Sequence, residues 1–259
     1  MKSIFVTGDK HGEISGFATR HYENFNDELK SSNKDENFLI VCGDFGFIWQ
    51  QKEDAIEDND LEILNNKPWT TLFVDGNHEN FARLNSEFDV VDFHGGKAHK
   101  IRDNIYHLMR GEIYDILGLK FFAFGGAKSH DIDDGILDYA DKDWKAKARQ
   151  LDKMGKFYYR VKGLNWWEEE LPNKEEMEYG LENLKKYNNE VDYIITHQPP
   201  EGIMLRTSVS KLDFNDFTTY LEKINYTISF KKWYSGHIHL DHEFDNRHKL
   251  LYDDWERII

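Results

Sequence analysis

The chain has 259 residues, of which 39% are apolar and 31% are charged, so it is long enough and apolar enough to bury a substantial core. Its 33 Lys and Arg residues face 48 Asp and Glu residues, which gives a formal net charge of −15. This balance argues against a broad basic surface for duplex nucleic acid or anionic membrane, so any phosphate site must be local. With Cys42 as its single cysteine, the chain lacks an internal disulfide and a thiolate zinc cluster, which fits a reducing compartment.

The N-terminal sequence MKSIFVTGDKHG indicates a strand rather than a leader. Its apolar run is only a few residues long, far shorter than the core of a signal peptide or a membrane span. The chain has 4 Pro and no Ser/Gly-rich linker, so it offers no evident domain boundary. We expect a cytoplasmic protein with a single domain over 1–259, no membrane association and an oligomeric state that the sequence leaves open.

Short apolar runs rich in β-branched residues predict strands that are covered on both faces. They lie at 3–7, 38–42, 70–74, 120–124, 191–196 and 232–234. Two helices are predicted between them. Asn173 would cap the first, with Met177, Leu181 and Leu184 on one side, and the second covers 213–224, with Phe214, Phe217, Leu221 and Ile224 at similar spacing. This alternation indicates an α/β protein.

Two later segments depart from that alternation. Residues 128–172 combine a Lys/Asp-rich stretch with aromatic runs and are predicted to be an insertion. Its aromatic residues are expected to form a small core of the insertion rather than to stack on a nucleobase; they are Tyr158, Tyr159, Trp166 and Trp167. The stretch 241–255 predicts a hairpin around Asp245 and Asn246.

Polar clusters follow five of the predicted strands. The clusters are GDKHG with Asp9 and His11, GDFG with Asp44, GNHE with Asn77 and His78, THQPP with His197, and GHIH with His237 and His239. Open α/β sheets bind ligands beyond the carboxyl ends of their strands, so these clusters are expected to meet in one crevice. A glycine precedes four of them, where the chain must turn and leave space; these are Gly8, Gly43, Gly76 and Gly236.

The residue types in these clusters predict a transition-metal site. Carboxylate, imidazole and amide oxygen together suit manganese, iron or zinc, whereas calcium or magnesium alone would call for an all-oxygen set.

The ordered set DKH, GD, GNHE, a lone His in THQPP, and GHIH resembles the calcineurin-like metallophosphoesterase superfamily, whose pattern runs D-x-H, GD, GNH-D/E, H and GHxH. The resemblance spans positions 9 to 239. It implies a double β-sheet sandwich flanked by helices, a four-layer αββα fold, with two divalent ions, manganese first and iron or zinc as alternatives. It further implies that one ion is held by Asp9, His11, Asp44 and His239 and the other by Asp44, Asn77, His197 and His237, with Asp44 bridging. Two divalent ions about 3.5–4 Å apart repel strongly, so the shared carboxylate and a bridging hydroxide are expected between them, and this hydroxide would attack phosphorus in line.

The resemblance also implies catalytic roles for Asp44 and His78, the latter protonating the leaving oxygen. One departure affects His78. Many members continue GD as GDxxD, and in some phosphatases the second Asp orients the catalytic histidine, but here that position is Phe47. Either His78 acts without a carboxylate partner, or another acid such as Glu79 or Asp75 takes that part.

Three further residues are candidates for the pocket. His130 lies in FGGAKSHD, which together with a later WW and ELP resembles a bacterial subgroup of these enzymes; it is either a substrate contact at the pocket rim or part of an ordinary strand-to-loop turn. Arg83, one turn past His78, is a candidate for a contact with a substrate phosphate, with a solvated helix surface as the alternative. Lys10 is expected at the rim with its side chain away from the metals. The other histidines are expected in surface or structural positions; they are His21, His94, His99, His107, His242 and His248.

The leading hypothesis is a metal-dependent phosphohydrolase that cleaves an intracellular phosphate ester. Within the same chemistry, a phosphodiesterase or nuclease acting on nucleotides or single-stranded nucleic acid is the alternative, to which the net charge of −15 is only a mild objection. An inactive binding protein on the same fold is the alternative from another class. The complete ligand set argues against it, because unpaired buried carboxylates and imidazoles are costly to retain without metal.

Overall fold

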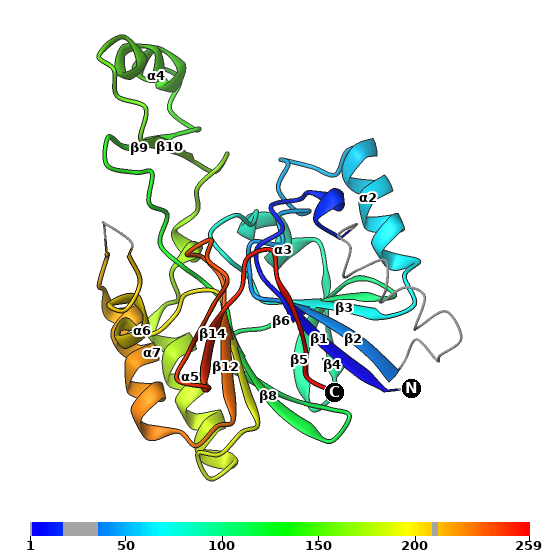
Figure 1. The fold of residues 1–259 in the computed structure, drawn as a ribbon. Helices are drawn as coiled ribbons and strands as arrows, with labels where there is room; N and C mark the ends of the chain where they lie inside the picture. Colours follow the sequence, from blue (N-terminus) through cyan, green and yellow to red (C-terminus); the bar gives the residue numbers. More distant parts are fainter. Residues whose placement is uncertain (1, 18–35, 209–211) are drawn as a thin grey trace.

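The protein consists of four layers, two β-sheets packed face to face with helices on both outer sides (Figure 1). This arrangement is seen in a computed structural model that describes residues 2–17, 36–208 and 212–259. His21 lies outside these residues. The expected α/β sandwich is confirmed.

The first sheet has the strand order β15-β1-β2-β3-β6-β5-β4 in the described part of the chain. Its centre is parallel and contains β1 (Ser3–Thr7), β2 (Asn37–Val41), β3 (Thr70–Phe73) and β6 (Ile105–Leu108). Antiparallel strands complete both edges: β4 (Asp89–Phe93) and β5 (Gly96–Arg102) on one side, and β15 (Trp255–Arg257) on the other. The strands predicted at 3–7, 38–42 and 70–74 are confirmed, whereas β4, β5 and β6 were not predicted.

The second sheet has the order β13-β14-β12-β11-β8-β7 in the same described ranges. Parallel pairing joins β8 (Leu119–Phe124), β11 (Tyr193–Thr196), β12 (Lys232–Ser235) and β14 (His248–Leu250). Antiparallel β7 (Glu112–Ile116) and β13 (His242–Phe244) form its edges. The predicted C-terminal hairpin is confirmed, since Asp245 and Asn246 turn between β13 and β14 with φ of 48° and 58°.

Helices cover the outer face of each sheet. The first sheet packs against α2 (Ala55–Asn65) and α3 (Phe81–Ser86), and the second against α5 (Lys174–Lys186) and α7 (Asp216–Thr227). A third apolar cluster, which includes Ile40 and Phe121, fills the space between the sheets. Two short elements, η1 (Ile14–Phe17) and α6 (Glu201–Met204), lie in connections.

Asparagine side chains set the start of both predicted helices. Asn173 caps α5 as expected, through a capping box with Glu176. The second helix, α7, begins at Asp216 rather than at 213, because the Asn215 side chain accepts hydrogen bonds from the first-turn backbone. Phe214 therefore lies before the helix and is 47% exposed.

The middle of the 128–172 segment projects away from the two sheets (Figure 1). It contains β9 (Gly135–Asp138), α4 (Trp144–Lys153), β10 (Tyr159–Lys162) and η3 (Glu168–Glu170), with β9 and β10 paired in a parallel ribbon. The expected aromatic core of this segment is wrong for two residues: Tyr158 is exposed, and Trp167 packs against Trp49 outside the segment. That the segment is an insertion into one domain stays a prediction.

None of the helices in the described ranges is both long enough and apolar enough to cross a membrane.

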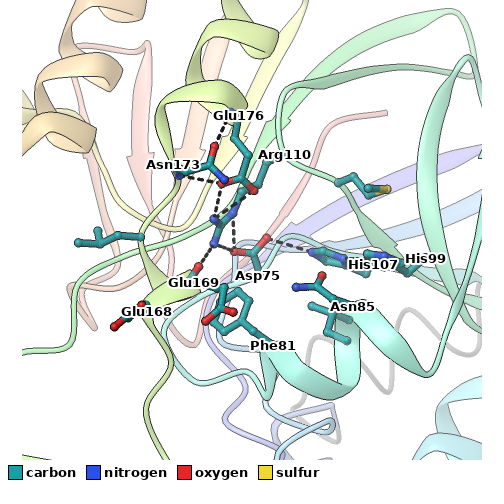
Figure 2. Close-up of a pocket in the computed structure, with 13 residues that line it drawn as sticks. Asp75, Phe81, Asn85, His99, His107, Arg110, Glu168, Glu169, Asn173 and Glu176 are labelled. Atoms are coloured by element: carbon teal, nitrogen blue, oxygen red, sulfur yellow. Dashed lines mark hydrogen bonds and ion pairs between the residues drawn. The ribbon is translucent and has the colours of Figure 1, made fainter. Parts of the chain in front are cut away.

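A buried ion-pair network joins the end of β3 to the second sheet (Figure 2). The Asp75 carboxylate accepts hydrogen bonds from Arg110 at 2.5 and 3.0 Å and contacts His107 Nε2 at 3.0 Å. Arg110 also donates to the backbone oxygen of Glu169 and lies near Glu176 of α5. This network fixes the loop that carries Asn77 and His78 relative to η3 and α5.

The pair His99 and His107 gives a testable pH dependence of stability. Their rings stack, and their Nδ1 atoms are 2.9 Å apart, a contact in which one nitrogen must be the acceptor. Burial and the neighbouring His107 lower the pKa of His99 to about 4. The unfolded chain therefore binds a proton at His99 at a higher pH than the folded protein does. The free energy of unfolding falls for this reason as the pH falls from about 6.5 toward 4.

We predict that His99→Gln flattens this pH dependence. Free energies of unfolding from urea titrations at pH 7 and pH 5 should differ less in the variant than in the wild type, by about 1–3 kcal/mol. The exposed His242 provides the control, because His242→Gln should leave the difference unchanged. An equal pH dependence in wild type and His99→Gln would contradict this account.

Candidate metal centre

The expected convergence of polar clusters at one edge of the molecule is present. Asp9 and His11 follow β1, Asp44 follows β2, Asn77 and His78 follow β3, His197 follows β11, and His237 and His239 follow β12. These strands are parallel within each sheet, so their carboxyl ends meet at the edge that both sheets share.

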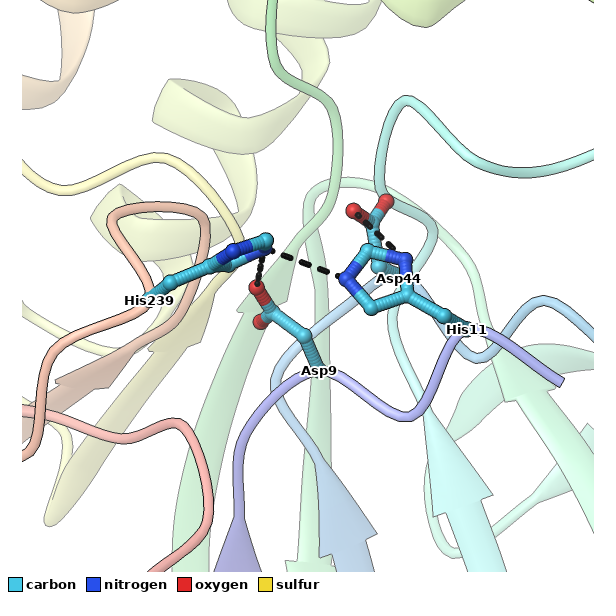
Figure 3. A group of neighbouring side chains, drawn as sticks. All are labelled: Asp9, His11, Asp44 and His239. Carbon is cyan, nitrogen blue, oxygen red and sulfur yellow. Dashed lines mark hydrogen bonds and ion pairs between the residues drawn. The ribbon is translucent and has the colours of Figure 1, made fainter. Parts of the chain in front are cut away.

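Four of these residues form a compact group of metal-ligating atoms (Figure 3). One ligand atom each from Asp9, His11, Asp44 and His239 lies within 4.8 Å of the others. His11 Nε2 is 3.1 Å from His239 Nε2, and His239 Nε2 is 3.2 Å from Asp9 Oδ2. These are the residues that the family resemblance assigned to one metal ion.

His197 approaches the same group from the second sheet. Its Nε2 atom lies 3.3 Å from Asp44 Oδ1, while its Nδ1 atom lies 2.8 Å from the Cys42 backbone oxygen. The ring of His237 packs 4.9 Å from that of His197, and the backbone N–H of His237 donates to both carboxylate oxygens of Asp9 at 3.1 Å. Asp44 therefore lies between ligand candidates from both sheets.

The donor set fits divalent cations. Asn77 Oδ1 and His197 Nε2 are buried and have no hydrogen-bond partner, which is costly unless another group binds them. The Nε2 atoms of His11 and His239 face each other and are likewise suited to bind one metal ion between them. Imidazole, carboxylate and amide oxygen together suit manganese, iron or zinc.

The electrostatics of the site also favour positive charge. Burial opposes protonation of His197, yet the carboxylates of Asp44 and Asp9 raise its pKa to about 9. Burial alone would raise the pKa of Asp44, but the neighbouring His197 holds it well below its usual range. The Asp44 carboxylate thus stays ionised and attracts a cation.

The backbone at the site is held in an uncommon conformation. His11, Asp44, His237 and His239 all have positive φ, between 46° and 67°. Non-glycine residues seldom adopt this region, and such strain is concentrated at functional sites. It places the four side chains at the turn that leaves each strand.

Two of the predicted glycines are required by close approach. A Cβ atom at Gly76 would lie 2.0 Å from Asp44 Oδ1, and one at Gly236 would lie 2.1 Å from Asp9 Oδ1. Any side chain at either position would displace a carboxylate of the metal centre. The steric role expected of these glycines is confirmed.

His78 has two partners that were not predicted from the sequence, Trp49 and Arg160. Its ring stacks on Trp49 at a centroid distance of 5.4 Å, and its Nε2 atom lies 3.3 Å from Arg160 Nη2. Burial lowers the pKa of His78 to about 4, and Arg160 contributes to that shift. A tryptophan face and a guanidinium therefore position this ring.

The acids proposed as partners of His78 are engaged elsewhere. The Glu79 carboxylate accepts hydrogen bonds from the backbone of Phe45 and Gly46, and Asp75 pairs with Arg110 and His107. Phe47, at the position of the usual Asp, is buried with Phe45 and Phe17 in the core. The suggestion that Glu79 or Asp75 replaces the missing carboxylate is therefore wrong.

The expected substrate contact of Arg83 is also contradicted. Its guanidinium is buried, and its Nη1 and Nη2 atoms donate to the two carboxylate oxygens of Glu57 at 2.8 and 2.7 Å. Its Nε atom donates to Glu87 at 2.8 Å. A guanidinium held by two carboxylates beneath the surface cannot receive a phosphate, so Arg83 fastens α3 to α2.

Lys10 and His130 had been placed at the pocket rim. Lys10 is buried rather than at the rim, and its Nζ atom donates to the Tyr252 backbone oxygen. The expected direction of its side chain, away from the metals, stays a prediction. His130 stacks on His237 at 4.4 Å and lines a pocket of about 390 Å³ over Asp44 and Asn77. The rim position of His130 is confirmed, and its contact with substrate stays a prediction.

Arg160 is the pocket residue that the sequence analysis missed. It lies on β10 of the 128–172 segment, and its contact with His78 joins residues 82 positions apart in the chain. No local motif marks such a contact. Only its place in an aromatic and basic stretch set it apart from other arginines.

The fold and the ligand cluster together define a metal-dependent hydrolase class built on two packed sheets. A family model described as calcineurin-like phosphoesterase matches residues 2–241. The chain therefore belongs to this family, and its site is that of a metal-dependent phosphoesterase. A search of curated proteins gives no match.

The ion-pair geometry predicts that Arg83→Met destabilises the fold without removing a substrate contact. Loss of one partner of a buried pair should lower the free energy of unfolding by about 3–5 kcal/mol. The control is Arg102→Met, whose partners Glu53 and Asp58 are partly exposed and whose loss should cost about 0–1 kcal/mol. A raised KM with an unchanged free energy of unfolding in Arg83→Met would instead support a contact between Arg83 and substrate.

The central position of Asp44 predicts that Asp44→Asn weakens binding of every ion at the site. A neutral amide attracts a divalent cation far less than a carboxylate, so the apparent metal affinity should fall tenfold or more, roughly. Elemental analysis after dialysis against manganese measures this, with the exposed Asp92→Asn as control. Full metal loading in Asp44→Asn would show that the ligand assignment is wrong.

Proposed function

We propose that the protein is a binuclear phosphohydrolase that cleaves a phosphate ester at the pocket over Asp44 and Asn77. The observation that carries this proposal is the set of ligand atoms around Asp44, supplied by both sheets and including two buried atoms without hydrogen bonds. Seven candidate side chains are more than one ion normally takes from protein alone. The two-ion stoichiometry, with manganese as the first candidate, is part of the proposal.

Ions held by these residues would supply an activated water and neutralise charge on the phosphoryl group. The protein itself supplies position. Asp44 lies between the two ligand groups, and its Oδ1 atom accepts a hydrogen bond from the His78 backbone N–H at 2.8 Å. This bond fixes the distance between the predicted bridging carboxylate and the loop that carries His78.

His78 is the candidate for a contact with the leaving oxygen. It lines the pocket beside the ligand Asn77 and is held by Trp49 and Arg160. Because an arginine only donates hydrogen bonds, His78 Nε2 is the acceptor in this contact. To protonate a leaving oxygen, Nε2 must first take up a proton. A phosphate that draws the guanidinium away and places its negative charge beside the ring would raise the pKa of His78 and favour that proton.

The assay that tests the proposal compares substrates on the manganese-loaded protein. Aryl phosphate monoesters, an aryl phosphodiester, cyclic nucleotides and short single-stranded oligonucleotides separate a phosphatase from a phosphodiesterase or nuclease. Activity should vanish on chelation and return with manganese. Full metal loading without turnover of any of these esters would favour an inactive binding protein.

We predict that His78→Ala keeps the metal content but lowers turnover of poor leaving groups by roughly 10²–10⁴-fold, the range of general acid catalysis. An aryl phosphate should be affected less, because its leaving group needs little help from a proton. Steady-state rates on an alkyl and an aryl monoester measure the difference. Equal losses on both would point to phosphate binding instead of leaving-group protonation.

A further inference from the structure

Arg160 brings a fixed positive charge to the candidate active site from outside the motif-bearing loops. It lies on β10, and its side chain lines the pocket with an exposed fraction of only 7% for the residue. Its Nη2 atom is 3.3 Å from His78 Nε2. Among the described residues that line this pocket, it is the one lysine or arginine.

The orientation of the Arg160 guanidinium is fixed from the side away from His78. Its Nε atom donates to Asp131 at 2.6 Å, and its Nη1 atom donates to the Asn165 backbone oxygen at 3.1 Å. Together with the His78 contact, these use three N–H groups of a guanidinium that carries about five. The group therefore keeps donor capacity while its position is held.

Arg160 differs in this respect from the other buried arginines near the site. Arg83 is clamped by Glu57 and Glu87, and Arg110 by Asp75 and Glu176. Among the described residues, the carboxylate that pairs with Arg160 belongs to Asp131, whose side chain is 46% exposed and therefore well solvated. The charge of Arg160 is thus less fully neutralised by protein groups.

The segment that carries Arg160 is braced against the rest of the molecule. Trp167 packs edge to face on Trp49 at 5.6 Å, and Trp49 in turn stacks on His78. Gln51 Nε2 donates to the Gly163 backbone oxygen at 2.9 Å. These contacts hold β10 over the pocket without a contribution from substrate.

We propose that Arg160 binds the phosphoryl oxygens of the substrate and thereby selects dianionic phosphomonoesters over monoanionic diesters. This inference rests on the proposed function and narrows its substrate class. The attraction of a guanidinium for a phosphate grows with the charge of that phosphate, and a monoester at neutral pH carries about twice the charge of a diester. The planar fork of donors also matches two phosphoryl oxygens at once.

The test compares Arg160→Gln with the wild type on two esters that share a 4-nitrophenolate leaving group, the monoester and its methyl diester. Arg160→Gln should lower kcat/KM for the monoester by roughly 10- to 100-fold and that for the diester severalfold at most. Lys162→Gln is the matched control, because Lys162 lies on the same strand with a side chain that is 46% exposed and paired with Glu168. It should leave both values unchanged.

Binding of inorganic phosphate gives a second readout that needs no turnover. Calorimetric titration of the manganese-loaded protein should show a Kd raised by roughly 10- to 100-fold in Arg160→Gln and unchanged in Lys162→Gln. Elemental analysis confirms equal metal content in all samples. If Arg160→Gln fails to fold, Arg160→Lys serves instead, with phosphate binding weakened severalfold because the fork is lost.

The outcomes separate this inference from the proposed function. Suppose that the wild type is active and that the Arg160 variants keep its monoester-to-diester ratio and its phosphate Kd. The proposed role of Arg160 is then wrong, and the proposed function still stands. A wild-type protein that binds phosphate through Arg160 yet turns over no ester with any divalent metal overturns the proposed function and supports the phosphate contact.

Discussion

Two carboxylates, Asp9 and Asp44, are buried close together at the edge that the two sheets share, with exposed fractions of 4% and 2%. Removal of a carboxylate from water is expensive unless a positive charge compensates for it. The imidazole of His197, 3.3 Å from Asp44, offers part of that compensation when it is protonated, but Asn77 Oδ1 remains without a hydrogen bond. Divalent ions held here in place of that proton would satisfy the charges and the open ligand positions together.

The fold delivers the ligands through parallel strands in both sheets. Each of the ligand-bearing strands ends at the same edge, and left-handed residues such as Asp44 and His237 redirect the chain there. Gly76 and Gly236 leave the space that the carboxylates occupy. Beyond this common centre, the 128–172 segment adds features that face the pocket: Arg160 contacts His78, and Trp167 supports Trp49 behind it. The candidate metal ligands and the proposed phosphate contact are thus carried by different parts of the chain.

Four of the predicted ligands form a group that could hold a metal ion, and the sequence pointed to them because they lie in short motifs directly after apolar strands. The partners of single side chains were harder to predict, since they depend on packing between distant positions. Arg83 was a candidate for a substrate contact, but its guanidinium forms a buried ion pair with Glu57, 26 residues away in the sequence. Phe47 suggested an incomplete catalytic pair, yet it belongs to the core, and His78 is positioned by Trp49 and Arg160 instead. The strands β4 and β5 were missed because polar residues such as Asp89, Asp92 and Lys97 interrupt their apolar runs.

The most direct test of a two-ion centre around Asp44 is anomalous diffraction from crystals soaked in manganese. Difference maps at the manganese absorption edge should show two peaks about 3.5–4 Å apart, with the Asp44 carboxylate between them. His11 and His239 should contact one peak, and Asn77, His197 and His237 the other. A single peak, or two peaks that do not share Asp44, would contradict the binuclear account.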